Sequence, residues 1–180
     1  DLYMSISKLS KNIEKYHNKF PPVNEWNPKL CEGEEFYIDR NGNWFHNSSI
    51  IKNERLINLF SRIIRKDELE YFLVTPFEKV PLKVELAPYK IINFDIFDNN
   101  IKLYTNLNFN FILDKINTMR LIKHNNSLIP LVVIRDNIEG FFDRNIYYNL
   151  INYALENNFI DNKKLYILSK NIKYKIGEVD

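Results

Sequence analysis

The sequence predicts an α+β protein built from two small units. Its 180 residues are enough for one large domain or two small ones. Three stretches have the apolar spacing of amphipathic helices, and many short stretches between them have strand patterns. A similar order of elements also occurs twice along the chain. These observations together favour two units, each with a helix packed on a small antiparallel sheet.

The first expected element is an N-terminal helix within residues 1–20. Apolar residues recur there at steps of three and four, from Leu2 to Phe20. Pro21 and Pro22 end this helix, because proline lacks an amide donor and restricts the residue before it. A loop that carries Trp26 follows.

The first α+β unit is expected to span residues 21–87. Strand patterns at residues 36–39 and 44–46 flank Asn41-Gly42, which is a strong signal for a hairpin turn. A helix then begins after Asn53, a plausible N-cap, and we expect Arg65 and Lys66 in its last turn. Two further strands, at residues 71–75 and 80–84, close the unit.

The second unit, residues 88–180, is expected to be richer in strands. Strand patterns occupy residues 89–97, 101–105, 110–113, 119–123, 131–135 and 138–142. A helix runs from Arg144 to Asn157, with Asp143 as its candidate cap. The chain closes with a strand pair at residues 165–168 and 172–176.

Two segments share an order of elements that favours an internal duplication. Phe36–Val84 and Leu131–Ile176 each read strand, turn, strand, helix, strand, strand. The sequence therefore predicts a duplicated strand-strand-helix-strand-strand motif on antiparallel sheets. Contact between two such units would form a cleft, which is a preferred place for ligands.

Composition and charge exclude several classes of protein. The net charge is only +2, whereas a dedicated nucleic-acid binder is usually strongly basic. No apolar run approaches the length of about 18 residues that a membrane span needs, and no signal-peptide core is visible at the start. One cysteine allows no intramolecular disulfide. We therefore expect a cytoplasmic protein without a membrane or nucleic-acid partner.

Catalytic and metal-binding patterns are weak throughout the sequence. The three histidines are far apart and lack the spacing of a metal site, so we expect them to be structural or solvated. Cys31 precedes several glutamates, which disfavour a reactive thiolate. The chain has no Gly-x-Ser-x-Gly elbow and no glycine-rich phosphate loop. We expect no enzymatic activity, no metal and no cofactor.

Basic and aromatic residues near strand ends give a better signal for binding. A cation beside an aromatic face is what a nucleotide-like anion requires. The candidate ligand-binding residues are Trp26, Arg65, Thr75, Glu78, Lys79, Thr105, Asn106 and Arg135. We expect Thr75, Glu78 and Lys79 of the first unit to face Thr105, Asn106 and Arg135 of the second across a shared cleft. The alternative is structural: core aromatics, and an ion pair of Arg135 with Glu78 or Asp136.

These residues resemble the bacterial DUF1285 family, whose members have no assigned function. The resemblance runs in order from about residue 21 to residue 158. Its stretches are Pro21-Pro22-Val23, Trp26-Asn27-Pro28, Cys31, Asn41-Gly42-Asn43-Trp44-Phe45, Leu56-Ile57-Asn58-Leu59-Phe60, Leu73-Val74-Thr75-Pro76-Phe77-Glu78-Lys79-Val80, Ala87-Pro88-Tyr89, Thr105-Asn106, Val133-Ile134-Arg135-Asp136, Glu139 and Arg144 with Tyr147-Tyr148-Asn149-Leu150. The chain departs from the family pattern at Ser48, Ile50, Asn53, Pro81 and Asn137.

The resemblance implies a two-part α+β fold whose C-terminal part is superficially similar to pleckstrin-homology-like barrels. It also implies a ligand site at the interface of the two parts, for a nucleotide-type molecule, and a role in signal transduction. The leading hypothesis is thus a non-catalytic module that senses a small anionic ligand. One alternative is a protein–protein adaptor that uses a sheet edge or an aromatic surface, without a small ligand. Another alternative is an enzyme with carboxylates in an inter-domain cleft.

Overall fold

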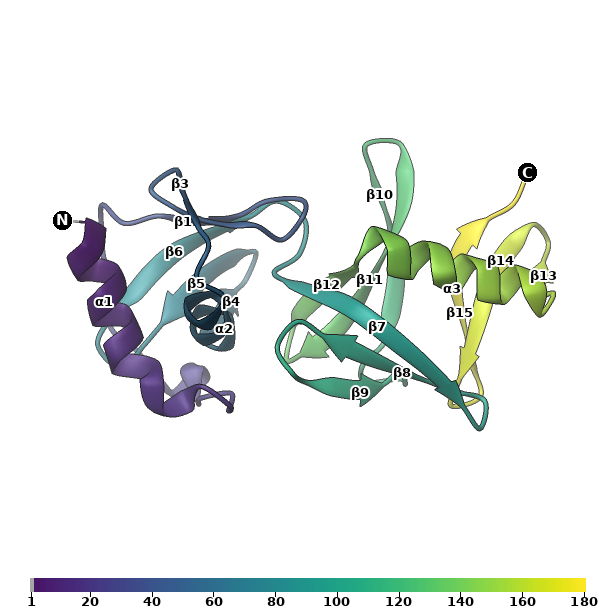
Figure 1. Ribbon diagram of the computed structural model, residues 1–180, viewed down its shortest axis with the longest axis horizontal. Helices are drawn as coiled ribbons and strands as arrows, with labels where there is room; N and C mark the ends of the chain where they lie inside the picture. Colours follow the sequence, from purple (N-terminus) through teal and green to yellow (C-terminus); the bar gives the residue numbers. More distant parts are fainter. Residues whose placement is uncertain (1) are drawn as a thin grey trace. The chain divides into compact units, whose positions relative to one another are not determined.

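The computed structural model describes residues 2–180, with side chains from Ile6 onward. It divides into two compact units, Asp1–Pro88 and Tyr89–Asp180 (Figure 1). Each unit combines strands with a few helices and has its own set of fully buried apolar side chains. The predicted two-part α+β fold is therefore confirmed.

The N-terminal helix is shorter than its apolar stripe predicts. Helix α1 covers Leu2–Ile13, and the chain leaves helical geometry at Ile13, where φ is −122° and ψ is 1°. Two short 3-10 helices follow, η1 at Glu14–Tyr16 and η2 at Val23–Glu25. Leu9 and Ile13 are only 2% and 0% exposed, so α1 is anchored by the central part of the stripe.

Helix α2 spans Glu54–Arg62 and begins at the predicted cap. The side chain of Asn53 accepts hydrogen bonds from the amides of Arg55 and Leu56. The predicted end of this helix is wrong, because strand β4 (Ile64–Asp67) starts directly after it and contains Arg65 and Lys66. Strand pairing and complete burial of the β-branched pair Ile63-Ile64 outweigh the helical spacing there.

The first unit contains a six-stranded sheet. Its strands are β1 (Phe36–Ile38), β2 (Trp44–His46), β3 (Ser49–Ile51), β4 (Ile64–Asp67), β5 (Glu70–Val74) and β6 (Lys79–Val84), in the spatial order β3-β2-β1-β6-β5-β4. The β1–β6 pair is parallel and the other neighbouring pairs are antiparallel. The turn between β1 and β2 holds Gly42 at a φ of 85°, as the predicted Asn-Gly hairpin requires.

The second unit contains one six-stranded sheet, a smaller sheet and a helix. The large sheet has the order β10-β11-β12-β7-β8-β9. Its strands are β7 (Tyr89–Phe97), β8 (Asn100–Thr105), β9 (Asn110–Ile112), β10 (Met119–His124), β11 (Ser127–Arg135) and β12 (Ile138–Phe142). Helix α3 (Arg144–Glu156) begins at the predicted cap Asp143. The small sheet pairs β13 (Ile160–Asp161), β14 (Lys164–Ser169) and β15 (Ile172–Glu178) in sequence order.

A buried serine connects the small sheet to the large one in the second unit. Ser169, at the end of β14, is 0% exposed. Its Oγ accepts a hydrogen bond from the amide of Ile101 at 3.0 Å and donates one to the carbonyl of Leu113 at 2.6 Å. The β14–β15 hairpin is thereby fixed against β8 and the chain that follows β9.

The two large sheets have the same strand topology. Each consists of two three-stranded meanders, joined by parallel pairing of the first strand with the last: β1 with β6, and β7 with β12. The structural repeat therefore relates Phe36–Val84 to Tyr89–Phe142. The predicted correspondence with Leu131–Ile176 is wrong, because β14 and β15 belong to the separate small sheet. Helix α2 lies between the meanders of the first repeat, where the second has only residues 113–118.

The core of the first unit is strongly aromatic. Trp44 is 1% exposed, which confirms its prediction as a core residue, and its ring lies 6.3 Å from that of Phe60. Phe36 lies 5.4 Å from Phe60 in an edge-on arrangement. In the part of the chain that the structure describes, no helix is long and apolar enough to cross a bilayer.

Candidate functional site

The candidate residues fall into two groups, one in each unit. The first unit holds Trp26, Arg65, Thr75, Glu78 and Lys79, and the second holds Thr105, Asn106 and Arg135. Each group is described within its own unit, and the cleft that both would share stays a prediction.

The strand register places several of the first unit's residues on one face of the sheet. Arg65 on β4 lies opposite Phe72 on β5, which in turn lies opposite Pro81 on β6. Because side chains alternate along a strand, Asp67 shares the face of Arg65, and Lys79 shares the face of Pro81. This face therefore carries two cations, one carboxylate and an aromatic ring.

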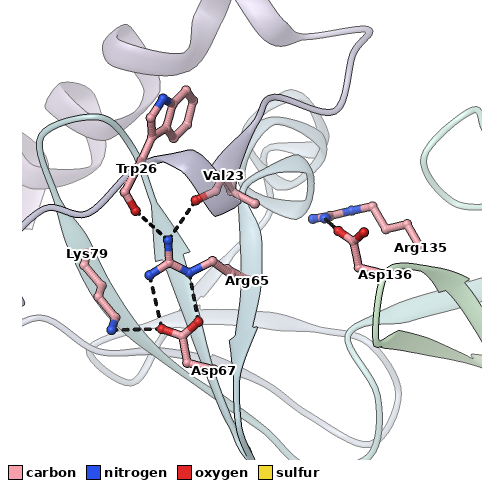
Figure 2. Close-up of polar contacts among 7 residues, drawn as sticks. All are labelled: Val23, Trp26, Arg65, Asp67, Lys79, Arg135 and Asp136. Carbon is pink, nitrogen blue, oxygen red and sulfur yellow. Dashed lines mark hydrogen bonds and ion pairs between the residues drawn. The ribbon is translucent and has the colours of Figure 1, made fainter.

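Arg65 is held by four hydrogen bonds, which Figure 2 shows. Its Nη1 donates to the carbonyl oxygens of Val23 at 2.7 Å and Trp26 at 2.6 Å. Its Nε and Nη2 donate to the two carboxylate oxygens of Asp67 at 2.9 and 3.1 Å, in a bidentate pair. Arg65 thus fixes the η2 loop to β4 through Nη1, while its Nε and Nη2 bind the carboxylate of Asp67.

Lys79 completes this arrangement on the neighbouring hairpin. Its Nζ lies 2.9 Å from Asp67 Oδ2 and 4.1 Å from the centre of the Phe72 ring. Burial raises the pKa of Asp67, but the hydrogen bonds from Arg65 and Lys79 outweigh this effect and bring that pKa below its usual value. We call these three side chains the Arg65–Asp67–Lys79 cluster; their formal charges sum to +1.

Solvent reaches the members of this cluster unequally. The side chain of Arg65 is 11% exposed, that of Lys79 is 23% exposed and that of Asp67 is 35% exposed. Trp26 is half-buried; its carbonyl accepts from Arg65, whereas its ring points away from Arg65 (Figure 2) and lies 5.7 Å from that of Tyr16. The cluster is therefore open to solvent mainly on the side of Asp67.

Sequence reasoning missed Asp67. The Arg-x-Asp spacing is its signal, since residues two apart lie on one face of a strand. That signal was hidden because the segment was expected to be the end of a helix, where residues two apart point in different directions.

Thr75 and Glu78 build the turn between β5 and β6. Thr75 is fully buried, and its Oγ1 accepts hydrogen bonds from the amides of Phe77 and Glu78 at 3.1 and 2.9 Å. The carboxylate of Glu78 is 14% exposed and lies 3.2 Å from Nζ of Lys8 on α1. Through these contacts both residues help to set the start of β6, and so the position of Lys79.

In the second unit, Arg135 lies at the end of β11, as predicted. Its Nε donates to the hydroxyl of Tyr89 at 3.0 Å, and its guanidinium lies 5.7 Å from the centre of that ring. Its Nη1 lies 3.5 Å from Oδ2 of Asp136, which was one of its predicted partners (Figure 2). The side chain of Arg135 is 11% exposed.

Thr105 and Asn106 also serve a turn. The Oγ1 of Thr105, which is 2% exposed, donates to the carbonyl of Phe109 at 2.8 Å. The amide of Asn106 donates to the carbonyl of Lys90 at 3.0 Å, and Asn106 Oδ1 accepts from the amide of Lys90 at 3.3 Å. These contacts join the end of β8 to the start of β7.

His46 is a buried titratable side chain outside the Arg65–Asp67–Lys79 cluster. His46 is 1% exposed, with Nε2 at 2.5 Å from Oε2 of Glu34, and its ring lies 4.6 Å from that of Phe36. His46 is thus one of the buried polar residues of the first unit. Among residues 2–180, no group of three or more His, Cys, Asp or Glu side chains is placed to hold a metal ion.

Comparison with known protein families gives a match for the first unit. Residues 21–87 match the family model described as the N-terminal domain of the domain of unknown function DUF1285. The chain is similar to the crystal structure of a DUF1285 family protein from Silicibacter pomeroyi, with a TM-score of 0.79 and 24% identity over 89% of this chain and 88% of that one.

A second solved structure is similar over a shorter part of this chain. It is a DUF1285 family protein from Shewanella baltica, with a TM-score of 0.55 and 27% identity over 68% of this chain and 94% of that one. No curated protein matches the chain.

Proposed function

For this chain, whose residues 21–87 match the N-terminal domain model of DUF1285, we propose a non-catalytic module that binds a small anionic ligand at the Arg65–Asp67–Lys79 cluster. The observation that carries this proposal is the placement of two cations around a single, partly exposed carboxylate. A local positive charge on a rigid sheet favours an anion, and it needs no group that reacts.

Lys79 is the residue of the cluster whose N–H donors are available to a ligand. An ammonium group has three N–H donors, and the hydrogen-bonding contact of Lys79 Nζ is with Asp67 Oδ2. Its remaining donors can meet a phosphoryl or carboxylate oxygen. The ring of Phe72 lies 4.1 Å from this Nζ, so an aromatic face borders the cation. This combination suits a ligand with an acidic group and a planar apolar part, such as a nucleotide.

Such a module would act in signal transduction by sensing the ligand. Arg65 links the cluster to the carbonyls of the η2 loop. A ligand that pulls on Arg65 or Lys79 would therefore act on the chain segment that follows α1. In this proposal the signal is a change in the order of that loop.

A thermal-shift screen of nucleotides and phosphorylated metabolites tests the proposal. A ligand at about 100 times its dissociation constant should stabilise the protein by about 2.7 kcal/mol. Lys79→Gln should abolish this shift. Lys83→Gln is the matched control, because Lys83 lies on the same strand and face but is 71% exposed and paired with Glu35. An equal shift in wild type and Lys79→Gln would refute the assignment, as would no shift with any anion.

A second function, protein–protein adaptor, has one observation in its favour. Phe77 is 71% exposed at the tip of the β5–β6 turn, where the hydroxyl of Thr75 fixes the backbone. A rigidly presented aromatic ring is a suitable anchor for a protein partner. If this is the function, Phe77→Ala loses a partner that Lys79→Gln retains, as measured by co-purification of the tagged variants.

A further inference from the structure

We propose that the carboxylate of Asp67 occupies, in the ligand-free protein, the position that the acidic group of the ligand takes. Binding would then exchange one two-oxygen anion for another. This inference rests on the function proposed above and names the ligand chemistry and the regulation of the same site.

The hydrogen bonds that the carboxylate of Asp67 accepts indicate which chemical group could replace it. Oδ1 accepts from Arg65 Nε at 2.9 Å, and Oδ2 accepts from Arg65 Nη2 at 3.1 Å. Oδ2 also lies 2.9 Å from Lys79 Nζ. The two cations are thus spaced so that a single pair of oxygens bridges them. A carboxylate offers such a pair, and so does one edge of a phosphoryl group.

The surrounding contacts indicate that Asp67 is the member that moves. Arg65 is fixed by the carbonyls of Val23 and Trp26, at 2.7 and 2.6 Å. The backbone of Lys79 is fixed by the amide of Cys31, which donates to its carbonyl at 2.7 Å. Asp67 is the last residue of β4, and its side chain is the most exposed of the three. A rotation of its side chain toward water would leave both cations in place.

Asp67 would therefore set the ligand concentration to which the site responds. A carboxylate tethered beside its cations has a high effective concentration, so a free anion must outcompete it. When Asp67 leaves, the charge that faces the ligand changes from +1 to +2. Monoanions with one weak contact would be rejected, whereas an anion that contacts Arg65 and Lys79 together would be accepted.

Asp67→Asn tests this exchange, because it removes the charge and keeps the shape. The matched control is Glu70→Gln, which changes the net charge equally at an exposed residue opposite Asp67 in the β4–β5 register. Inorganic phosphate and acetate are the probes, titrated by calorimetry at constant ionic strength. We expect Asp67→Asn to bind phosphate at least about tenfold more tightly than wild type, the change that about 1.4 kcal/mol gives. Glu70→Gln should stay close to wild type.

The outcomes separate this inference from the proposed function. If wild type binds phosphate and Asp67→Asn binds equally or less tightly, the exchange is refuted and the proposed function stands. If Asp67→Asn binds and wild type does not bind any anion, the exchange is supported and the proposed function of the native chain fails. If neither protein binds, both fail.

A measurement on the wild-type protein keeps the inference testable if Asp67→Asn does not fold. The carboxyl ¹³C resonance of Asp67 should shift saturably as inorganic phosphate is added, because that carboxylate loses its hydrogen bonds. The corresponding resonance of Glu70 should not shift. A saturable response at Lys79 without any response at Asp67 would overturn the proposed exchange.

Discussion

Replacement of Arg65 by methionine should destabilise the first unit, whatever the ligand is. Arg65 Nη1 donates to the carbonyls of Val23 and Trp26. The methionine side chain has a similar length but no hydrogen-bond donor. Val23 is 2% exposed, so its carbonyl would keep the hydrogen bond from the amide of Trp26 but gain no water in place of Arg65, whereas the carbonyl of the half-buried Trp26 would regain water in part. A hydrogen bond to a charged group contributes about 1.5–3 kcal/mol, and the bond to the more exposed Trp26 carbonyl contributes less than the one to Val23. We expect a loss of about 2–4 kcal/mol.

Urea unfolding followed by tryptophan fluorescence measures this loss. The chain has two tryptophans, Trp26 and Trp44, and both lie in the first unit, so the signal reports that unit alone. Arg55→Met is the control, because Arg55 is 68% exposed and pairs with an exposed Glu14, an interaction worth about 0–1 kcal/mol. If Arg65→Met unfolds at the same urea concentration as Arg55→Met, Arg65 does not tether the η2 loop and the reasoning is wrong.

Three further predictions concern the core, the small sheet and the pH dependence of stability. Trp44→Ala should cost about 3–5 kcal/mol, measured by circular dichroism in urea, because Trp44 is 1% exposed; a variant as stable as wild type would contradict this. Ser169→Ala should cost about 1–3 kcal/mol, since it orphans the amide of Ile101 and the carbonyl of Leu113, whereas Ser127→Ala, at an exposed residue, should be neutral. The pKa of Asp67 is lowered in the folded protein, so its stabilising effect is present above its unfolded pKa of about 3.9 and is lost as pH falls through the folded value. The urea midpoints of wild type and Asp67→Asn should therefore converge as pH is lowered from 7 to 3, and a constant difference would refute the ion pair.

Local signals predicted much of the secondary structure. Asn53 and Asp143 were recognisable as helix caps because their short side chains can accept from amides in the first turn, and both do so. The end of α2 was not recognisable, because Leu59, Phe60, Ile63 and Ile64 fit a helical face as well as a helix followed by a strand. Only pairing of β4 with β5 decides between these alternatives, and that contact is tertiary.

The abundance of asparagine has a structural role that composition alone did not reveal. The chain has only 4 glycines. Within residues 2–180, 14 residues other than glycine have positive φ, and most of them are asparagine, for example Asn99, Asn125 and Asn171. Asparagine tolerates the left-handed region better than other residues with a side chain. Asparagine thus forms the strand turns that glycine usually forms.

The repeat shows why order of elements is a weak guide to topology. Leu131–Ile176 has the same sequence of strands and helix as Phe36–Val84, yet its last strands join a separate sheet. The true correspondence depends on parallel pairing of β1 with β6 and of β7 with β12, which joins strands far apart in the chain. Nothing in a local pattern encodes which distant strand becomes a neighbour.

The candidate site was predictable in its cations but not in its arrangement. Arg65 stood out as a basic residue at the expected end of a helix and Lys79 as one in a turn between strands, and the structure brings both to Asp67. Thr75 and Thr105 were also chosen because they lie where strands end. In the structure the buried hydroxyl of each forms hydrogen bonds with the backbone of its own turn. A sequence does not distinguish a polar side chain that closes a turn from one that faces a ligand, since both lie where strands end.

The central claim is that the Arg65–Asp67–Lys79 cluster binds an anion, and a titration of the wild-type protein with adenosine monophosphate tests it most directly. The side-chain Nε–H resonance of Arg65 and the Nζ resonance of Lys79 can be followed by ¹⁵N-edited NMR, with Lys83 as an internal control on the same strand. The account predicts saturable shifts at Arg65 and Lys79 with one common dissociation constant, and none at Lys83. Equal, unsaturable shifts at Lys79 and Lys83, or saturable shifts only at residues outside the cluster, would contradict it.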